Sequence, residues 1–310
     1  MDQVVIDNLK VGAYWSTAEE SGSFSPSVYW LANPLVQKRF RKKAVGGRNY
    51  NSWPGFCVDV YLKSLSPVER VLSVGCGSGQ LERDLAHMIP IDQIDAIDVA
   101  PGMIEEAQRR AEQEGLEMIN YLLGNVEEGG FPGHGYHAIF FNMSLHHMFA
   151  MDETLQKTAE AINADGFLFL NEYVGPNRFA FTEREKEVIS SLHALIPDRF
   201  RYSLADHNRG FPQSSVVFPD PLEVARVDPS ESVCSAEILP NLEKHFDIIE
   251  LNQTGGTVLQ FLLHNIAGHF RKEDPESLKV LDFLFKAEDL LIEIGELDSH
   301  FVTVVAKKKV

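Results

Sequence analysis

The sequence contains little cysteine and no long apolar run. Its 3 cysteines, Cys57, Cys76 and Cys234, form neither a C-x-x-C pair nor a metal-type spacing. Such sparse cysteine excludes a disulfide framework and is typical of a reducing compartment. No apolar stretch reaches the ~18 residues that a membrane span requires, and the first residues lack the basic and apolar regions of a signal peptide. These absences predict a cytoplasmic protein with no membrane partner.

Basic side chains are also fewer than acidic ones. The chain has 28 Lys and Arg against 45 Asp and Glu, a net charge of −17. A nucleic-acid backbone would be repelled by this charge unless a local basic patch intervened. The basic clusters are the run 38–43, which is typical of a solvated helix face, and the terminal run 307–309. The composition therefore disfavours a nucleic-acid partner.

The most informative motif is a strand that runs into three alternating glycines. Residues 71–79 read Val-Leu-Ser-Val-Gly-Cys-Gly-Ser-Gly, and a helix pattern follows at once. Such a loop lets a ligand approach the backbone beside the positive end of a helix. The next strand, 94–98, ends in Asp98, and a carboxylate about 20 residues after the first glycine commonly binds a ribose diol. Together these features predict a nucleoside-binding βαβ unit.

Short apolar strands alternate with amphipathic helices from residue 71 onward, which predicts a parallel sheet. A polar, proline-bearing segment near 198–233 interrupts the alternation, and such lengths are usually functional or disordered. The expected strands are 70–74, 94–98, 119–122, 137–142, 167–173, 245–251 and 301–306, and the expected helices are 80–88, 101–114, 152–163, 257–270 and 276–294.

The glycine loop, Asp98, the run 124–127 and the run Phe-Asn-Met-Ser-Leu-His-His at 141–147 together resemble the class I S-adenosylmethionine-dependent methyltransferase family. The resemblance implies a Rossmann-like α/β fold with a seven-stranded, mostly parallel sheet of order 3-2-1-4-5-7-6. It also suggests a bacterial subgroup that methylates glycans and small metabolites. On this basis we expect a helical N-terminal cap or lid at 1–65 and a cofactor-binding domain at 66–310. Within that domain, 176–240 is a substrate-side insertion between strands 5 and 6.

The same resemblance assigns S-adenosylmethionine as the cofactor and names residues that bind it. The implied cofactor-binding residues are Gly75, Cys76, Gly77 and Gly79 in the loop, Asp98 at the ribose, Val99 at the adenine face, Asn125 and Val126 at the base, and Asn142 at the methionine. Two positions depart from the family pattern. Asn125 replaces a common Asp, and Ser73 replaces an acidic residue near the methionine ammonium, so another group must compensate for the missing carboxylate.

Four residues at the ends of the fourth and fifth strands are candidates for catalysis. His146 and His147 follow the fourth strand, and one of them is a candidate general base; alternatively both are structural or line the pocket. Glu172 would orient the acceptor or instead pair with Arg178, and the Tyr173 ring would contact the sulfonium. His264 and His269 have no partners at metal-ligand spacing, so no metal is predicted.

The sequence therefore predicts a methyltransferase that acts on a small polar acceptor, sugar-like or a secondary metabolite, with oxygen slightly preferred over nitrogen. Two alternatives stay open. The cofactor's own amine would attack its γ-carbon and release methylthioadenosine, or the protein would be a non-catalytic cofactor-binding scaffold. Neither the acceptor nor the oligomeric state is indicated by the sequence.

Overall fold

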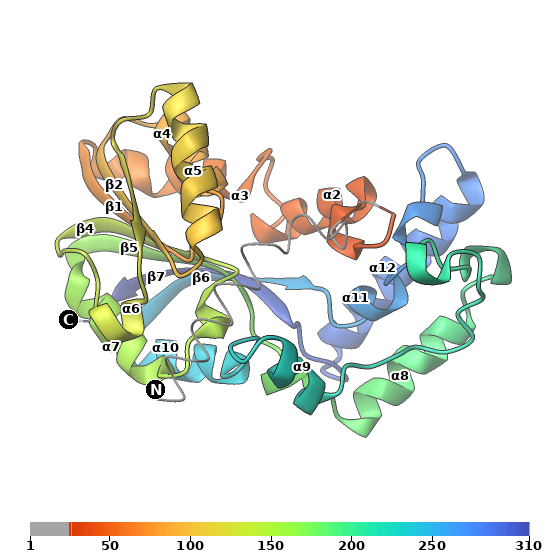
Figure 1. Ribbon diagram of the computed structural model, residues 1–310. Helices are drawn as coiled ribbons and strands as arrows, with labels where there is room; N and C mark the ends of the chain where they lie inside the picture. Colours follow the sequence, from red (N-terminus) through yellow and green to blue (C-terminus); the bar gives the residue numbers. More distant parts are fainter. Residues whose placement is uncertain (1–24, 26, 310) are drawn as a thin grey trace.

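The computed structural model describes residues 25 and 27–309, and its centre is one seven-stranded sheet (Figure 1). The strand order is β3-β2-β1-β4-β5-β7-β6, and β7 runs antiparallel to both of its neighbours. The predicted order and the mostly parallel arrangement are confirmed. The strands are β1 (Val68–Val74), β2 (Ile91–Asp98), β3 (Ile119–Leu123), β4 (Tyr136–Asn142), β5 (Ile162–Tyr173), β6 (Phe246–Gly255) and β7 (Phe301–Lys308).

Helices cover both faces of the sheet because successive strand residues point to opposite faces and both sets are apolar. Phe140 packs toward one core with α3 (Trp53–Val60), α4 (Gln80–Met88) and α5 (Pro101–Glu114). Its neighbour Phe141 packs toward the other core. That second core includes residues of α6 (Val126–Gly129), α7 (Met151–Ala161) and α10 (Ile238–His245).

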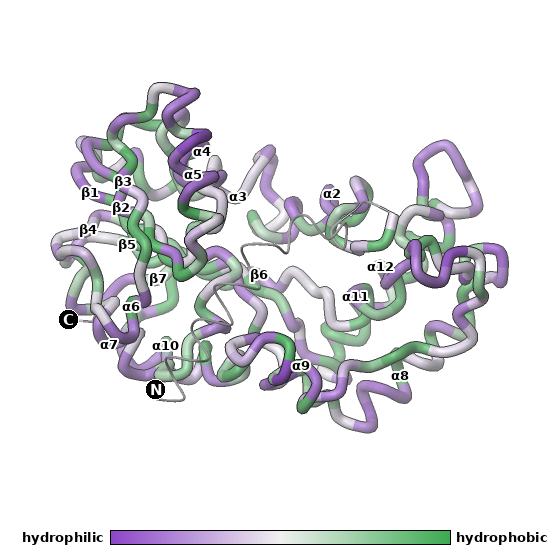
Figure 2. The backbone as a smooth tube through the Cα atoms, viewed as in Figure 1, coloured by the Kyte–Doolittle hydropathy of each residue, from purple (hydrophilic) through white to green (hydrophobic). Residues whose placement is uncertain are grey.

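A third apolar core lies beyond the carboxyl end of β5 and the start of β7, on the right in Figure 1. Trp30, Tyr173 and Phe301 join it to the sheet through ring contacts of 5.3 to 5.6 Å between Phe301 and the other two. Its helices are α2 (Pro34–Ala44), α8 (Glu183–Ala194), α11 (Leu259–Leu262) and α12 (Pro275–Glu293). Figure 2 shows hydrophobic colour where strands and inner helix faces meet, and hydrophilic colour on outer turns.

The long connection between β5 and β6 is folded and contains α8, α9 (Pro221–Val227) and α10. Several 3-10 turns complete the described chain: η2 (Trp30–Ala32), η3 (Leu62–Leu65), η4 (Leu145–His147), η5 (Asn177–Phe179), η6 (Asp198–Phe200), η7 (Asp206–Asn208), η8 (Ser235–Glu237) and η9 (Ala267–His269). The predicted helix 257–270 is wrong, because only α11 and η9 form there. Asn265 adopts a left-handed φ of 60°, which interrupts a helix.

The N-terminal segment 1–65 falls in part outside the described residues. From Trp30 onward it packs against the rest of the chain. Helix α2 contacts β6, and Arg39 pairs with Glu288 and Asp289 of α12 at 2.9 and 2.7 Å. Helix α3 packs on α4. Within the described part of the chain, no helix is both long and apolar enough to cross a membrane.

Candidate cofactor-binding and catalytic site

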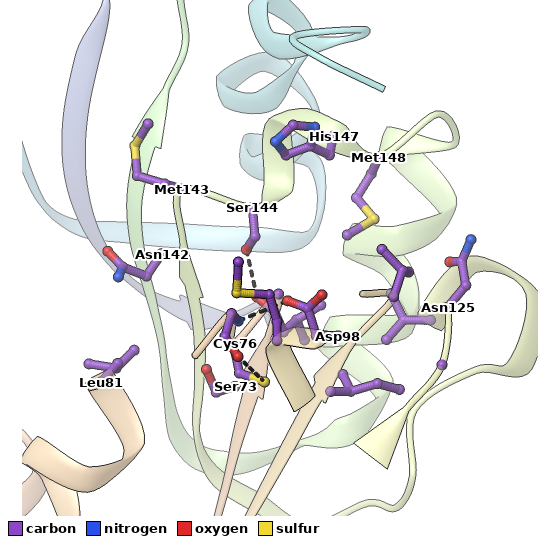
Figure 3. A pocket seen from close by; sticks show the side chains of 18 of the residues that line it. Ser73, Cys76, Leu81, Asp98, Asn125, Asn142, Met143, Ser144, His147 and Met148 are labelled. Carbon is purple, nitrogen blue, oxygen red and sulfur yellow. Dashed lines mark hydrogen bonds between the residues drawn. The ribbon is translucent and has the colours of Figure 1, made fainter. Parts of the chain in front are cut away.

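A cavity of about 650 Å³ opens at the carboxyl ends of β1, β2 and β4 (Figure 3). In open α/β sheets this edge is where ligands bind. The structure brings most of the predicted residues to its wall: Gly75, Cys76, Gly77, Asp98, Val99, Asn125, Val126, Asn142 and His147. The remaining predicted residues, Gly79, His146, Glu172 and Tyr173, lie close by but outside the lining of this cavity.

The three loop glycines serve different purposes. A Cβ at Gly75 would meet the Cβ of Ser144 at 2.3 Å, and a Cβ at Gly79 would meet the Tyr121 hydroxyl at 2.3 Å. A Cβ at Gly77, which has a φ of 52°, would meet no described atom within 4 Å. Packing therefore requires the first and third glycines, whereas Gly77 leaves the floor of the cavity open to a ligand.

Asp98 holds the glycine loop in place. Its Oδ2 accepts a hydrogen bond from the Gly77 N–H at 2.8 Å, and its Oδ1 accepts one from the Ala100 N–H at 2.9 Å. Burial raises the pKa of Asp98, while these backbone donors act in the opposite direction. Because each carboxylate oxygen has a further lone pair, Asp98 can still accept hydrogen bonds from the hydroxyls of a bound ribose.

Two asparagines stand on opposite sides of Asp98 in Figure 3. Asn142 accepts a hydrogen bond at Oδ1 from the Asn171 Nδ2 at 2.8 Å, so its own NH2 group is available for the cavity. Asn125 accepts one at Oδ1 from the Glu127 N–H at 2.9 Å, as the N-cap of α6. The line Asn142, Asp98, Asn125 suits an elongated ligand that has a sugar in its middle.

Behind the cavity wall, Glu172 organises the turn that carries the two histidines. Glu172 is fully buried. Its Oε1 accepts hydrogen bonds from the N–H groups of Ser144 and Leu145, both at 2.8 Å, and its Oε2 lies 2.6 Å from the His146 Nδ1. The alternative pairing of Glu172 with Arg178 is wrong, because Arg178 donates instead to backbone carbonyls of the segment 228–231.

His146 is held between carboxylates. Burial lowers the pKa of His146, but the charge and hydrogen bond of Glu172, with the charges of Glu231 and Asp228, raise it, and the net shift is upward. The Glu231 Oε1 lies 3.8 Å from the other ring nitrogen, Nε2. An imidazole in this setting favours the protonated form and is therefore a poor proton acceptor. Glu172 and His146 thus position the turn.

Tyr173 lies in the third apolar core. It is 2% exposed, packs against Phe179 and Phe301, and donates a hydrogen bond to the Pro176 carbonyl at 3.3 Å. A ring enclosed in this way does not reach the cavity, so the predicted contact between Tyr173 and the sulfonium is wrong. Its position at the end of β5 indicated proximity to the cavity, whereas the side chain points into the core.

His147 lines the cavity and has the opposite character to His146. Its Nδ1 lies 2.9 Å from the Ser230 Oγ, and Ser230 donates its hydroxyl proton to the Asp228 Oδ1 at 2.7 Å. Because that proton is used, the His147 Nδ1 is the donor in its bond to Ser230, and the lone pair lies on Nε2. Burial, with the charge of His146, lowers the pKa of His147. His147 is therefore a neutral imidazole suited to accept a proton.

The segment 228–231 supplies the partners of both histidines from the predicted insertion. The sequence pointed to polar groups in this stretch but gave no reason to prefer Asp228, Ser230 or Glu231, because the long connection has no periodicity that fixes a register. The fold brings it back to the sheet edge: Ser230 and Asp228 are 4% and 3% exposed.

Three of these side chains stand close enough to be considered as a metal site. His146, His147 and Glu231 each offer a ligand atom, and these atoms lie within 4.8 Å of one another. His146 already lies 2.6 Å from Glu172 through Nδ1 and 3.8 Å from Glu231 through Nε2. The sequence predicted no metal, and that absence stays a prediction.

Comparison with known proteins identifies the fold and the cofactor. Residues 71–166, which include the glycine loop, Asp98 and the two histidines, match the family model of a methyltransferase domain. This part of the chain is a methyltransferase domain and resembles those of class I S-adenosylmethionine-dependent methyltransferases. Its cofactor is S-adenosylmethionine. The open floor at Gly77 and the acceptor at Asp98 fit the shape and the ribose of that molecule.

Individual relatives within the methyltransferase family are distant. The chain is 29% identical over 140 residues to a malonyl-[acyl-carrier protein] O-methyltransferase of Anoxybacillus flavithermus, over 45% of this chain and 52% of the relative. It is 36% identical over 78 residues to aklanonic acid methyltransferase DauC of a Streptomyces species, over 25% and 36%. The chain thus spans about half or less of the length of these relatives.

A solved structure covers nearly the whole chain. The [4+2]-cyclase SpnF aligns over 98% of this chain and 96% of its own, with a TM-score of 0.52 and 16% sequence identity. At this identity the likeness shows the fold alone.

Proposed function

We propose that this protein transfers the methyl group of S-adenosylmethionine to a hydroxyl group of a small polar acceptor, with His147 as the general base. The observation that carries the proposal is the Asp228–Ser230–His147 chain. It places a neutral imidazole on the wall of the cofactor cavity with its lone pair on Nε2. A base of this kind assists an alcohol, which must lose its proton, more than a neutral amine, which already has a lone pair.

The chain's own residues perform the remaining work. When bound, S-adenosylmethionine supplies an activated methyl group on a positively charged sulfur. Asn142 and Asp98 orient that cofactor, and His147 takes the acceptor proton at Nε2 as the acceptor oxygen attacks. Such alignment can lower the barrier by about 7–11 kcal/mol, and general-base help contributes a further ~10²- to 10⁴-fold in rate.

A small, hydroxylated acceptor suits the part of the cavity beside His147. Ser230 and Met148 also line the cavity, Asp228 lies 3.9 Å from His147, and Glu231 lies 3.8 Å from His146. The net charge of −17 favours a small molecule over a polyanion. The O-methyltransferase name of the Anoxybacillus relative supports an oxygen acceptor. The glycan and small-metabolite subgroup stays part of this proposal.

The test is a product analysis. Purified protein is incubated with S-adenosylmethionine, with and without a cell metabolite extract, and the products are identified by mass spectrometry. We expect S-adenosylhomocysteine only when extract is present, together with an acceptor that has gained one methyl group. The control is the conservative variant Asp92→Asn, at an exposed position of β2. It should give the same products as the native protein.

Two outcomes would contradict methyl transfer. Methylthioadenosine formed without extract would mean that the cofactor is itself the substrate, as in intramolecular cyclisation. Unchanged S-adenosylmethionine in the presence of extracts from several growth conditions would instead favour a non-catalytic scaffold.

A further inference from the structure

A buried carboxylate in the cofactor cavity has no cation bound to it among the described residues. Glu82 lies in the first turn of α4, is 0% exposed and lines the same cavity as Ser73 and Asn142. Neither of its carboxylate oxygens makes a hydrogen bond of normal geometry to a described residue, although the Ser73 hydroxyl is near enough to lower its pKa. Buried carboxylates are costly unless they are paired. An unpaired carboxylate that faces a ligand cavity therefore indicates a positively charged ligand group.

No neighbouring side chain described in the structure donates a charged hydrogen bond to Glu82, so a ligand can supply that positive charge. Burial raises the pKa of Glu82 to about 7; the Ser73 hydroxyl and the Arg83 charge oppose the rise, and Asp98 adds to it. The Cys76 thiol and the Tyr121 phenol face Glu82 from the loop and from β3, and neither supplies a positive charge. Arg83 is directed to Glu114, with 3.0 Å between Nε and Oε1.

We propose that Glu82 binds the α-ammonium of the methionine part of S-adenosylmethionine, and so replaces the carboxylate that Ser73 lacks. Ser73 lines this cavity from β1, and Glu82 lines it from α4. The carboxylate that the family pattern places on the strand is therefore supplied by the helix in this chain. The inference rests on the cofactor named in the proposed function.

The assignment also affects the choice between methyl transfer and cyclisation. An amine that is held as ammonium by a carboxylate has no lone pair with which to attack the γ-carbon of its own cofactor. The absence of a carboxylate at position 73 favours cyclisation, because no group on that strand would hold the amine as ammonium. A carboxylate at Glu82 removes that support. A cofactor held in this way keeps its methyl group as the reactive site.

The experiment is calorimetric titration of the native protein and of Glu82→Gln with two ligands. S-adenosylhomocysteine carries the ammonium, whereas methylthioadenosine keeps the nucleoside and lacks the amino acid. Loss of a charged hydrogen bond should weaken S-adenosylhomocysteine binding by about 10- to 100-fold and leave methylthioadenosine binding unchanged. The control is Glu105→Gln, an exposed carboxylate on α5. Adding Ser73→Asp to Glu82→Gln should restore most of the affinity.

Two further readouts separate ligand binding from a structural role. Since Glu82 is partly protonated in the free protein and charged in the complex, affinity should rise between about pH 6 and about pH 8 in native protein but not in Glu82→Gln. Removing an unpaired buried carboxylate should also raise the thermal midpoint of the free protein at about pH 8. A group that merely supported the fold would lower that midpoint when replaced.

The outcomes are distinguishable. Native protein that binds neither ligand would overturn the proposed function itself. Native protein that binds both ligands, with Glu82→Gln equal to it in affinity for S-adenosylhomocysteine, would overturn the role of Glu82. Equal weakening of both ligands would do the same, because methylthioadenosine has no ammonium.

Discussion

Replacement of His147 by alanine is expected to lower turnover by about 10²- to 10⁴-fold, because the acceptor hydroxyl then loses its proton acceptor. Affinity for S-adenosylhomocysteine should stay near that of the native protein, since Asp98 and Asn142 are untouched. The measurement is the initial rate of S-adenosylhomocysteine formation with the metabolite extract, alongside calorimetric binding. The control is His87→Ala, an exposed histidine that pairs with Glu114.

The pH profile adds a signature of the base. Because burial and the charge of His146 lower the pKa of His147, the native rate should be level at neutral pH and should fall only below the ordinary histidine value of about 6.5. Asp228, Glu231 and Glu172 also face this ring and limit the lowering. Ser230→Ala removes the acceptor that fixes the tautomer and should reduce kcat more than it changes KM. A His147→Ala protein with undiminished turnover would refute the general-base role.

Replacement of Glu172 by alanine should destabilise the fold by roughly 3–5 kcal/mol, the usual effect of removing one partner of a buried ion pair. The change leaves the His146 Nδ1 and the N–H groups of Ser144 and Leu145 without their acceptor. The measurement is urea unfolding followed by circular dichroism. Glu153→Ala, which breaks an exposed pair with Lys157, should cost at most about 1 kcal/mol.

The dependence of this effect on pH follows from the upward shift of the His146 pKa. A group with a raised pKa in the folded state stabilises the protein fully below its unfolded value of about 6.5, and the contribution disappears as pH rises through the folded value. The difference between native protein and Glu172→Ala should therefore be largest near pH 6 and should shrink in alkaline solution. Equal differences at both extremes would mean that Glu172 acts through the backbone amides alone.

Much of the fold followed from the sequence because the signals are local. Apolar strands that alternate with amphipathic helices predict a parallel sheet, and the glycine loop fixes where the first strand ends. The error at 257–270 arose where apolar composition suited either a helix or irregular packing. Asn265, with its left-handed backbone, ends the regular structure there, and a single asparagine gives too weak a signal to predict this.

Site residues could be predicted where the position of the backbone brings them to the cavity. They could not be predicted where the direction of the side chain decides whether it reaches the cavity. Asp98 and Asn142 end strands at the ligand edge, so their places followed from the topology. Tyr173 also ends a strand, yet its ring enters the core. Glu82 was missed, although it lies on the same helix face as Leu85, three residues on, and a charged residue on a buried face is a usable signal.

The most direct test of the account is cofactor binding at Asp98. Native protein is titrated with S-adenosylhomocysteine in a calorimeter and compared with Asp98→Ala, with Asp92→Ala at an exposed position of the same strand as the control. The account predicts saturable binding to native protein and to the control. It predicts no measurable binding to Asp98→Ala, whose circular dichroism spectrum should be unchanged. Unaltered affinity in Asp98→Ala would contradict the assignment of this cavity to S-adenosylmethionine.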